Sequence, residues 1–322
     1  MTTAIQPDKI LSELSHQWDQ LDHDEAASGG VLRACSMTLV VTAADDADAE
    51  TVRRCVGVLM HEHPSRAVVL KAREPSAGES LEFDARVFAE CWKPFGSSQQ
   101  ICSEGVEIAA DAESLEQAAR FLVPLKAPDL PLVLWCRGSQ VFQLRSFDAL
   151  FPVADKIVFD SAEAPRAAAA LSFLRGLRSR GFRVADLHWT RLTGWREVLA
   201  HLFDDQALPA SSITASRIVY GGAAPSTCAL YFAAWIATAL PDARLSMVSE
   251  AGDSGLRSVT LTGAASELSL TKIGSMETGA SIEVKGCGRH YLSPLPPADE
   301  ESLMREELKI LGPDLVYDRV LG

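Results

Sequence analysis

The sequence lacks the short motifs that identify most enzymes and metal proteins. Its seven cysteines, at positions 35, 55, 91, 102, 136, 228 and 287, form no C-x-x-C pair, and its seven histidines are not spaced as zinc ligands. It contains no G-x-S-x-G, Walker, H-E-x-x-H, protein-kinase or EF-hand motif. From these absences we expect a protein that is not an enzyme and that needs neither a metal nor a cofactor.

Basic residues and long apolar runs are also scarce. The chain has 30 Lys and Arg against 43 Asp and Glu, a net charge of −13. Nucleic acids and anionic lipids bind clustered Lys and Arg, so neither is an expected partner. The longest apolar run, residues 228–240, is too short to cross a bilayer, and residues 1–10 have no basic start or apolar segment typical of a secretion signal. We therefore expect a cytoplasmic protein.

What is present predicts a large α/β protein. With 322 residues, 47% of them hydrophobic, the chain can bury two cores of ordinary size. We predict two α/β units with mixed sheets, residues 1–154 and 155–322, and at the C-terminal end an antiparallel meander and short helices.

Hydrophobic periodicity predicts the elements of both units. In the first unit, apolar residues at helical spacing predict helices at residues 7–24, 49–60 and 114–125. Apolar or alternating runs, several rich in β-branched residues, predict strands at 37–42, 67–70, 81–87, 101–108 and 130–136. In the second, we predict helices at residues 164–180, 227–240, 300–311 and 313–321, and strands at 156–159, 213–220, 244–249, 256–261, 267–273 and 281–285. A β-α-β unit over residues 37–70 and a hairpin of 81–87 with 101–108 make the first sheet mixed.

Residues 186–205 place two tryptophans and two arginines at the junction of a strand and a helix. Thr193 is a suitable N-cap, and apolar residues at i, i+3, i+4, i+7 and i+8 from Trp195 predict one buried helix face. Near such a face, Arg191 and Arg196 need carboxylates or aromatic rings as partners. The candidates nearby are Asp186, Trp189, Trp195, Glu197 and Asp204. We interpret the segment as an ion-paired anchor and not as a reaction centre.

Two polar loops allow more than one interpretation. The sequence His61-Glu62-His63-Pro64-Ser65-Arg66 lies between a predicted helix and strand, where an α/β protein often has its site. For its histidines we favour a solvated turn, whereas Arg66 is as compatible with an anion or partner contact as with a turn. Asp160-Ser161 ends a predicted strand and is equally typical of a ligand-binding edge and of a helix start.

The glycine-rich loop of residues 221–226 joins a predicted strand to a predicted helix. Gly221, Gly222 and the helix-capping Ser226 leave backbone amides that could bind a phosphate. The loop lacks the Lys of a Walker motif and the spacing of a dinucleotide-binding motif. Binding of a phosphorylated metabolite here, by a sensor or an enzyme, is our alternative hypothesis for the whole chain.

Cys91 and Cys102 flank the predicted hairpin, which could bring their thiols together as a redox switch. The spread of all seven cysteines through predicted strands and helices favours buried thiols in a reducing compartment instead. Cys102 lies beside Glu104, but no histidine is near in the sequence, so a buried strand is favoured over a catalytic thiol.

Several of these segments together, in their order and spacing, resemble the OpcA family, the glucose-6-phosphate dehydrogenase assembly proteins. The most specific is Asp-Leu-His-Trp-Thr-Arg-Leu-Thr-Gly-Trp-Arg at residues 186–196, where the family usually has Asn at His188 and Ala at Thr190. The others are residues 33–41 (beginning at Arg33), 63–66, 102–104, 129–135, 159–161 and 306–317. Residues 33–205 match well, and residues 212–297 match only loosely.

The resemblance implies a non-catalytic partner of glucose-6-phosphate dehydrogenase. Such a protein promotes the active oligomer of the dehydrogenase and so supports NADPH production in the oxidative pentose phosphate pathway, and in cyanobacterial members this role is linked to redox control. An allosteric activator of this kind agrees with a patterned core that lacks catalytic motifs. As partner-binding or ion-paired anchor residues we name Arg33, Arg66, Glu104, Asp160, Asp186, Trp189, Arg191, Trp195 and Arg196.

Overall fold

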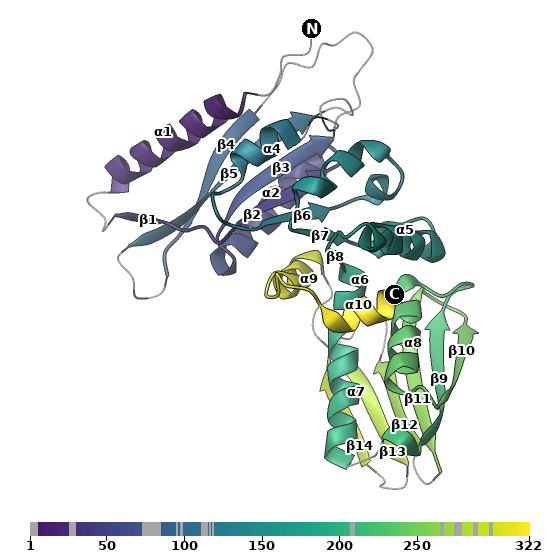
Figure 1. Cartoon of the computed structure of the whole chain (residues 1–322). Helices are drawn as coiled ribbons and strands as arrows, with labels where there is room; N and C mark the ends of the chain where they lie inside the picture. The colour runs from purple at the N-terminus through teal and green to yellow at the C-terminus, as the bar shows by residue number, and fades with distance from the viewer. Residues whose placement is uncertain are drawn as a thin grey trace. The chain divides into compact units, whose positions relative to one another are not determined.

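The computed structural model describes residues 6–25, 30–72, 85–94, 96, 99–110, 115, 117, 119–206, 210–264, 267–273, 279–285, 289–295 and 299–322. Contacts divide the chain into two compact units (Figure 1). Unit 1 comprises Met1–Asp160 and Leu177–Ala185, and unit 2 comprises Ser161–Gly176 and Asp186–Gly322. Residues 155–160 and 177–185, which follow the predicted boundary at residue 154, thus belong to unit 1, because strands β7 (Lys156–Phe159) and β8 (Val184–Asp186) extend its sheet.

Unit 1 is built on an eight-stranded sheet with the order β1-β5-β3-β2-β6-β7-β8, to which β4 adds by pairing with β5. The strands are β1 (Val31–Arg33), β2 (Met37–Ala43), β3 (Ser65–Ala72), β4 (Ala85–Trp92), β5 (Gln100–Ala110) and β6 (Leu132–Cys136), with β7 and β8. The ladders from β1 to β7 are parallel, and β4 runs antiparallel to β5. A mixed sheet is confirmed, although residues 81–84 of the predicted strand lie outside the described residues.

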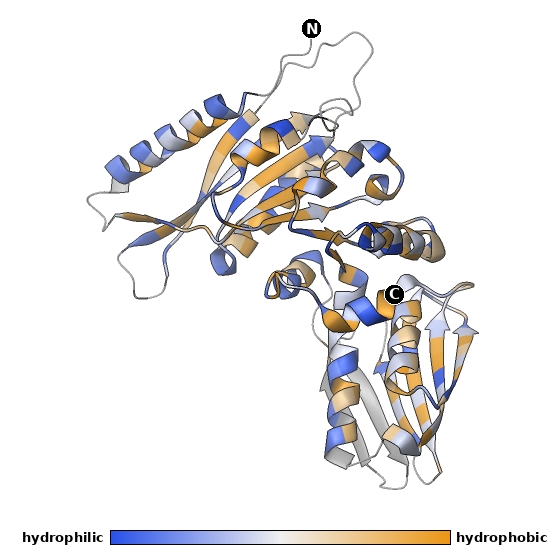
Figure 2. Ribbon diagram, in the orientation of Figure 1, coloured by the Kyte–Doolittle hydropathy of each residue, from blue (hydrophilic) through white to orange (hydrophobic). Residues whose placement is uncertain are grey.

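Helices cover both faces of this sheet. Helix α2 (Asp46–Glu62) joins β2 to β3, and Lys71 of β3 contacts it through Asp46. Arg66, an odd number of residues away on the same strand, points to the other face and contacts α4 (Ala119–Leu125) at Leu125, while α1 (Pro7–Glu25) packs beside β4. The central strands are buried on both faces, so they are almost continuously apolar (Figure 2). Three short 3-10 helices follow β6: η1 (Ser139–Phe142), η2 (Arg145–Ala149) and η3 (Phe151–Val153).

Unit 2 contains a six-stranded sheet with the order β10-β9-β11-β12-β13-β14. Its strands are β9 (Ile213–Gly221), β10 (Arg244–Glu250), β11 (Gly255–Gly263), β12 (Glu267–Ile273), β13 (Gly279–Lys285) and β14 (Arg289–Pro294). Helix α8 (Thr227–Ala239) connects the parallel pair β9 and β10, and the remaining ladders are antiparallel. The predicted meander is confirmed. Strand β14 was not predicted, because its residues, Arg-His-Tyr-Leu-Ser-Pro, do not alternate clearly.

Unit 2 contains six other helices among the described residues, of which α6, α9 and α10 begin with a capping aspartate. They are η4 (Ser161–Glu163), α6 (Leu187–Thr190), α7 (Thr193–Gln206), η5 (Ala210–Ser212), α9 (Glu300–Glu307) and α10 (Leu315–Leu321). Asp299 and Asp314 accept backbone N–H groups at the starts of α9 and α10, which confirms the predicted short C-terminal helices. Helix α5 (Ala167–Ser179) crosses the boundary between the units at Gly176.

Candidate functional site

The first cluster of charged residues lies in unit 1 around Glu104 of β5. This carboxylate is 3% exposed. Its Oε1 accepts hydrogen bonds from Arg33 Nη2 at 2.6 Å and Arg66 Nε at 2.5 Å, and its Oε2 accepts one from Trp18 Nε1 at 2.5 Å. Burial by itself raises the pKa of Glu104, but the hydrogen bond from Trp18 and the charge and hydrogen bonds of the arginines outweigh it, so the pKa lies below its usual value.

This cluster joins several elements that are distant in the sequence. Arg33 comes from β1, Trp18 from α1 and Arg66 from β3, and Arg66 Nη1 also donates to the Leu125 carbonyl of α4 at 2.9 Å. Arg66 is buried and two of its nitrogens are occupied by protein, which disfavours a role in binding an external anion. Arg33 stacks on the Trp18 ring at 5.2 Å and is half-exposed. The geometry is that of an ion-paired anchor.

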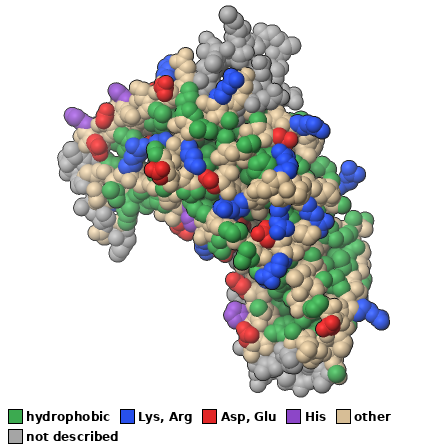
Figure 3. Space-filling model, in the orientation of Figure 1, with side chains coloured by type: hydrophobic (Ala, Val, Ile, Leu, Met, Phe, Trp, Pro, Cys, Tyr) green, Lys and Arg blue, Asp and Glu red, His purple; other side chains and the backbone are tan. Residues whose placement is uncertain are grey.

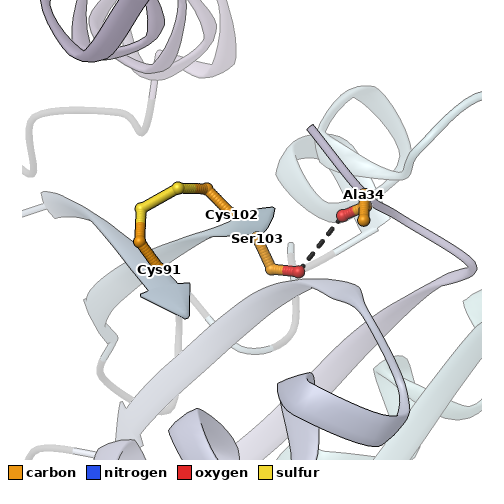
Figure 4. Close-up of a disulfide and its surroundings, with 4 residues drawn as sticks. All are labelled: Ala34, Cys91, Cys102 and Ser103. Carbon is orange, nitrogen blue, oxygen red and sulfur yellow. Dashed lines mark hydrogen bonds between the residues drawn. A yellow bond between two sulfur atoms is a disulfide. The ribbon is translucent and has the colours of Figure 1, made fainter. Parts of the chain in front are cut away.

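A disulfide joins Cys91 and Cys102 beside this anchor (Figure 4). The two residues are direct partners in the antiparallel register of β4 and β5, with Cα atoms 4.1 Å apart. Our expectation of free thiols is therefore wrong for this pair, because the hairpin register that brings them opposite each other cannot be counted from the sequence alone. Next to them, Ser103 donates to the Ala34 carbonyl at 3.1 Å and so holds the chain that leaves β1 (Figure 4).

The other cysteines that the structure describes are not joined in disulfides. Cys136 is fully buried, and burial raises the pKa of its thiol strongly. Cys35, Cys55 and Cys228 are half-buried. A thiol with a raised pKa is a poor nucleophile, so Cys136 is not a catalytic candidate.

The second cluster lies in unit 2 around Asp186, whose carboxylate is completely buried. Its Oδ1 accepts the backbone N–H groups of Ser161 and His188, each at 3.0 Å, and its Oδ2 accepts the Tyr231 hydroxyl at 2.8 Å. The hydroxyls of Tyr231 and Tyr317 lie 3.0 Å apart. Burial raises the pKa of Asp186 to about 6, although these hydrogen bonds act in the opposite direction. Burial, together with the charge of Asp186, also raises the pKa of both tyrosines.

Trp189 and Arg196 extend this cluster toward Asp314 at the start of the last helix, α10. The Arg196 guanidinium lies 3.7 Å from the centre of the Trp189 ring, and its Nη2 donates to Thr193 Oγ1 at 3.0 Å. Trp189 Nε1 donates to Asp314 Oδ2 at 2.9 Å. Burial lowers the pKa of Arg196, while the charge of Asp314 raises it. Arg196 therefore has an aromatic ring as its close partner, and the nearby Glu197 is exposed.

Most of residues 186–196 are buried. Their role as an ion-paired anchor stays a prediction, and most of their partners were not predicted. Trp195 is 6% exposed and packs edge-on against Phe232 of α8 at 6.0 Å, whereas Arg191 is only half-buried. Tyr231 and Tyr317 were not named beforehand. The available signals were the single tyrosine in the apolar run of α8 and the match of the C-terminal residues to the family.

Ser161 and His188 form a pair that resembles part of a hydrolytic site. Ser161 Oγ lies 3.2 Å from His188 Nδ1, and Asp186 is adjacent. In a catalytic triad the carboxylate orients the imidazole ring and the serine is accessible. Here Asp186 binds the backbone of His188 instead, and Ser161 is 2% exposed. The pair is better explained as packing at the start of η4, and the neighbouring Asp160 is likewise buried.

The loop of residues 221–226 connects β9 to α8, as the sequence predicted. Gly222 has a φ of 93°, and a Cβ on Gly221 would lie 2.0 Å from the Asp253 carbonyl oxygen, so both positions require glycine. Ser226 caps α8 by accepting the Ala229 N–H at 3.3 Å. The structure thus gives these residues a local structural role, and phosphate binding stays a prediction.

In unit 1, the end of β2 is the place where a doubly wound sheet commonly binds a nucleotide, because β3 and β6 lie on opposite sides of β2. Here α2 begins with Asp45, Asp46 and Asp48, and Asp48 pairs with Arg137 at 2.7 Å. Carboxylates at a helix N-terminus repel a pyrophosphate, and no glycine allows close approach of one. This arrangement does not favour a dinucleotide cofactor.

A polar pocket of about 480 Å³ opens beside α2 in unit 1. Lys71 lines it, with Nζ 2.9 Å from Asp46 and 2.7 Å from Glu107, and Arg53 of the same lining pairs with Glu50. Burial alone lowers the pKa of Lys71, but the two carboxylates raise it above its usual value. Lys71 and Arg53 are thus neutralised by carboxylates of the same pocket. Among the described residues there is no group of three His, Cys, Asp or Glu side chains fit to hold a metal, and no helix long and apolar enough to cross a membrane.

Comparison with known proteins matches both halves of the chain to one family. Residues 57–176 match the glucose-6-phosphate dehydrogenase subunit N-terminal domain, and residues 182–321 match the C-terminal domain of the same subunit. The chain belongs to the OpcA family of glucose-6-phosphate dehydrogenase subunits. The resemblance noted from residues 186–196 is thereby confirmed.

Curated relatives of the family come from cyanobacteria and are named OxPP cycle protein OpcA. The protein of Nostoc punctiforme is 28% identical over 194 residues, 59% of this chain and 41% of the relative. That of Synechococcus elongatus is 27% identical over 207 residues, 63% of this chain and 45% of the relative. The chain spans less than half the length of these relatives.

Solved structures that align with most of this chain include oxidoreductases with little sequence identity. A 3-ketoreductase from Actinomadura kijaniata, in complex with NADP and TDP-benzene, is 7% identical over 88% of this chain and 94% of that chain, with a TM-score of 0.48. A Gfo/Idh/MocA family oxidoreductase from Vibrio cholerae is 10% identical over 89% and 94%, with a TM-score of 0.47. This likeness gives no information about activity.

Proposed function

We propose that this chain is a non-catalytic, cytoplasmic subunit that binds glucose-6-phosphate dehydrogenase and favours its active assembly. The observation that supports the proposal is the match of both dehydrogenase-subunit domains, over residues 57–176 and 182–321. The family's most specific residues, 186–196, lie in a buried structural cluster and not around a reaction cleft, as expected of a binding subunit. Activation of the dehydrogenase would support NADPH production in the oxidative pentose phosphate pathway.

Such a subunit activates only through a difference in affinity. It must bind the active assembly of the dehydrogenase more tightly than the inactive one, and each tenfold difference shifts the equilibrium by about 1.4 kcal/mol. The two anchors described above suit this task, because the Glu104 and Asp186 clusters each fix several elements of one unit. A rigid binding surface loses little conformational entropy when the complex forms.

The test is a titration of glucose-6-phosphate dehydrogenase from the same organism with this protein at fixed substrate, with the mass of the mixture followed by light scattering. We expect a saturable rise in rate that coincides with a larger complex. A complex without any rise in rate would reduce the role to that of a scaffold. If neither a complex nor a rise in rate were observed, the proposal would be wrong.

The alternative function is binding of a phosphorylated metabolite by the loop of residues 221–226, and the position of this loop at the N-terminus of α8 favours it. Ala224 is exposed, so Ala224→Glu places a negative charge there without the backbone strain of a change at Gly222. Loss of sugar-phosphate binding in that variant, measured by calorimetry against the exposed control Ala200→Glu on α7, would support the alternative. Dehydrogenase binding that is unchanged in both variants would favour the first proposal.

A further inference from the structure

The C-terminal segment of unit 2 exposes large hydrophobic side chains. Ile310, Leu315 and Val316 are 60%, 66% and 38% exposed. Seven large hydrophobic side chains are exposed in the part of the chain that the structure describes, and these three fall within seven consecutive residues. The other four are isolated from one another along unit 1. We call Ile310, Leu315 and Val316 the C-terminal apolar patch.

Four hydrogen bonds, of which one is exposed, two are partly buried and one is buried, hold the segment that carries this patch in place. Asp314 Oδ1 accepts the N–H groups of Val316 and Tyr317 at 2.9 and 3.0 Å, and its Oδ2 accepts Trp189 Nε1. The Tyr317 hydroxyl contacts the Tyr231 hydroxyl inside the Asp186 cluster. The segment that bears the patch is therefore fixed by residues 186–196, which we call the Trp-rich motif, although the apolar side chains of the patch itself are exposed.

The preceding helix is tied to the same motif. Glu307 at the end of α9 accepts the Thr190 hydroxyl at 2.6 Å, so the residues on both sides of Ile310 are attached to the segment of residues 186–196. An apolar surface that is already ordered binds a partner without a large loss of conformational entropy. Exposed apolar patches on otherwise well-packed proteins commonly mark protein interfaces.

The net charge of the segment that carries the patch indicates what kind of partner surface would bind there. Residues 299–322 contain seven acidic and three basic side chains, a net charge of −4. On the visible face of unit 2, Figure 3 shows hydrophobic side chains together with both acidic and basic ones. A second copy of this chain would bring like charges together, and anionic membranes and nucleic acids would be repelled in the same way. An apolar surface bordered by Lys and Arg complements the patch.

We propose that the C-terminal apolar patch is the docking surface for glucose-6-phosphate dehydrogenase, and that it receives an apolar surface with a basic rim on the dehydrogenase. This inference rests on the proposed function. It also gives a reason for the buried Trp-rich motif, which acts as the support of the interface and does not itself touch the partner.

The test compares matched pairs of substitutions. The double variant I310D/L315D changes two side chains that are more than half exposed, so its thermal stability should equal that of the wild type. V123D/L144D is the control, because Val123 and Leu144 are 59% and 49% exposed on unit 1. We expect I310D/L315D to weaken dehydrogenase binding roughly 30-fold or more, as at an interface hot spot. The control should bind as the wild type does, and wild-type affinity should fall with added salt.

The outcomes separate this inference from the proposed function. Wild-type binding that both double variants retain would overturn the docking surface alone and leave the proposed function intact. A wild-type chain that does not bind the dehydrogenase would overturn both. If the wild type formed a dimer by light scattering and I310D/L315D did not, the patch would be a self-association surface and the inference would be wrong.

Discussion

Substitution of the buried Asp186 by Asn should remove a pH dependence of folding that this one carboxyl group creates. Burial raises the pKa of Asp186 from 3.8 to about 6. The folded chain therefore holds this proton more tightly than the unfolded chain does. Between these two pKa values the folded state binds more protons, so the free energy of unfolding falls as the pH rises.

The magnitude follows from the size of the shift. About two pKa units correspond to a loss of about 3 kcal/mol of stability between pH 4 and pH 7, because each unit is worth about 1.4 kcal/mol. Asn has nearly the same shape as Asp. Its oxygen can accept the N–H groups of Ser161 and His188, and its amide can donate to the Tyr231 hydroxyl oxygen. The variant should therefore keep the hydrogen bonds but lose the titration.

The assay is urea unfolding of wild type and D186N at several pH values, followed by tryptophan fluorescence, since Trp189 contacts Tyr231. The unfolding free energy of the variant minus that of the wild type should rise by about 3 kcal/mol from pH 4 to 7 and stay level above that. D299N is a control of opposite sign, because the Ser302 N–H lowers the pKa of Asp299. A difference for D186N that is independent of pH, or that falls with rising pH, would refute the reasoning.

Three further predictions concern stability. Trp195→Ala should lower the free energy of unfolding by roughly 3–5 kcal/mol through lost transfer energy and packing, and an unchanged melting temperature would contradict this. Glu104→Gln should lower the free energy of unfolding by roughly 3–5 kcal/mol at neutral pH, because Arg66 loses its buried counter-charge. Since the pKa of Glu104 is lowered in the folded chain, this difference between variant and wild type should shrink as the pH falls below 4.5. Unfolding measured at pH 3 and pH 7 would check this. The double variant C91S/C102S should be less stable by about 3 kcal/mol under oxidising conditions and equal to the wild type in excess reductant, and equal stability without reductant would show that the disulfide does not form.

Much of the fold follows from local patterns. The run at residues 130–136 predicted the buried strand β6 because a strand covered on both faces needs apolar side chains at every position. The alternating runs after residue 255 predicted the meander because one face of that sheet is buried and the other is polar. These signals depend on neighbours in the sequence, so no knowledge of distant contacts was needed.

The partners of the predicted site residues could not be predicted from the sequence in this way. Asp186 meets Tyr231 across 45 residues and Tyr231 meets Tyr317 across 86, and no periodic pattern records such distances. Cys91 and Cys102 were recognised as near neighbours, but their pairing depends on the hairpin register, which a shift of one residue would change. The charge and polarity of a residue indicate that it needs a partner when it is buried. Which partner it has depends on the topology of the fold.

The path of the chain between the two units limits how they can be made separately. The chain leaves unit 1 at Asp160, contributes residues 161–176 to unit 2, and returns for residues 177–185 before it leaves again at Asp186. A gene truncated after residue 160 would encode unit 1 without β8, and a gene that starts at residue 186 would encode unit 2 without η4 and most of α5. On the ribosome, the sheet of unit 1 cannot be completed until the first segment of unit 2 has also been synthesised.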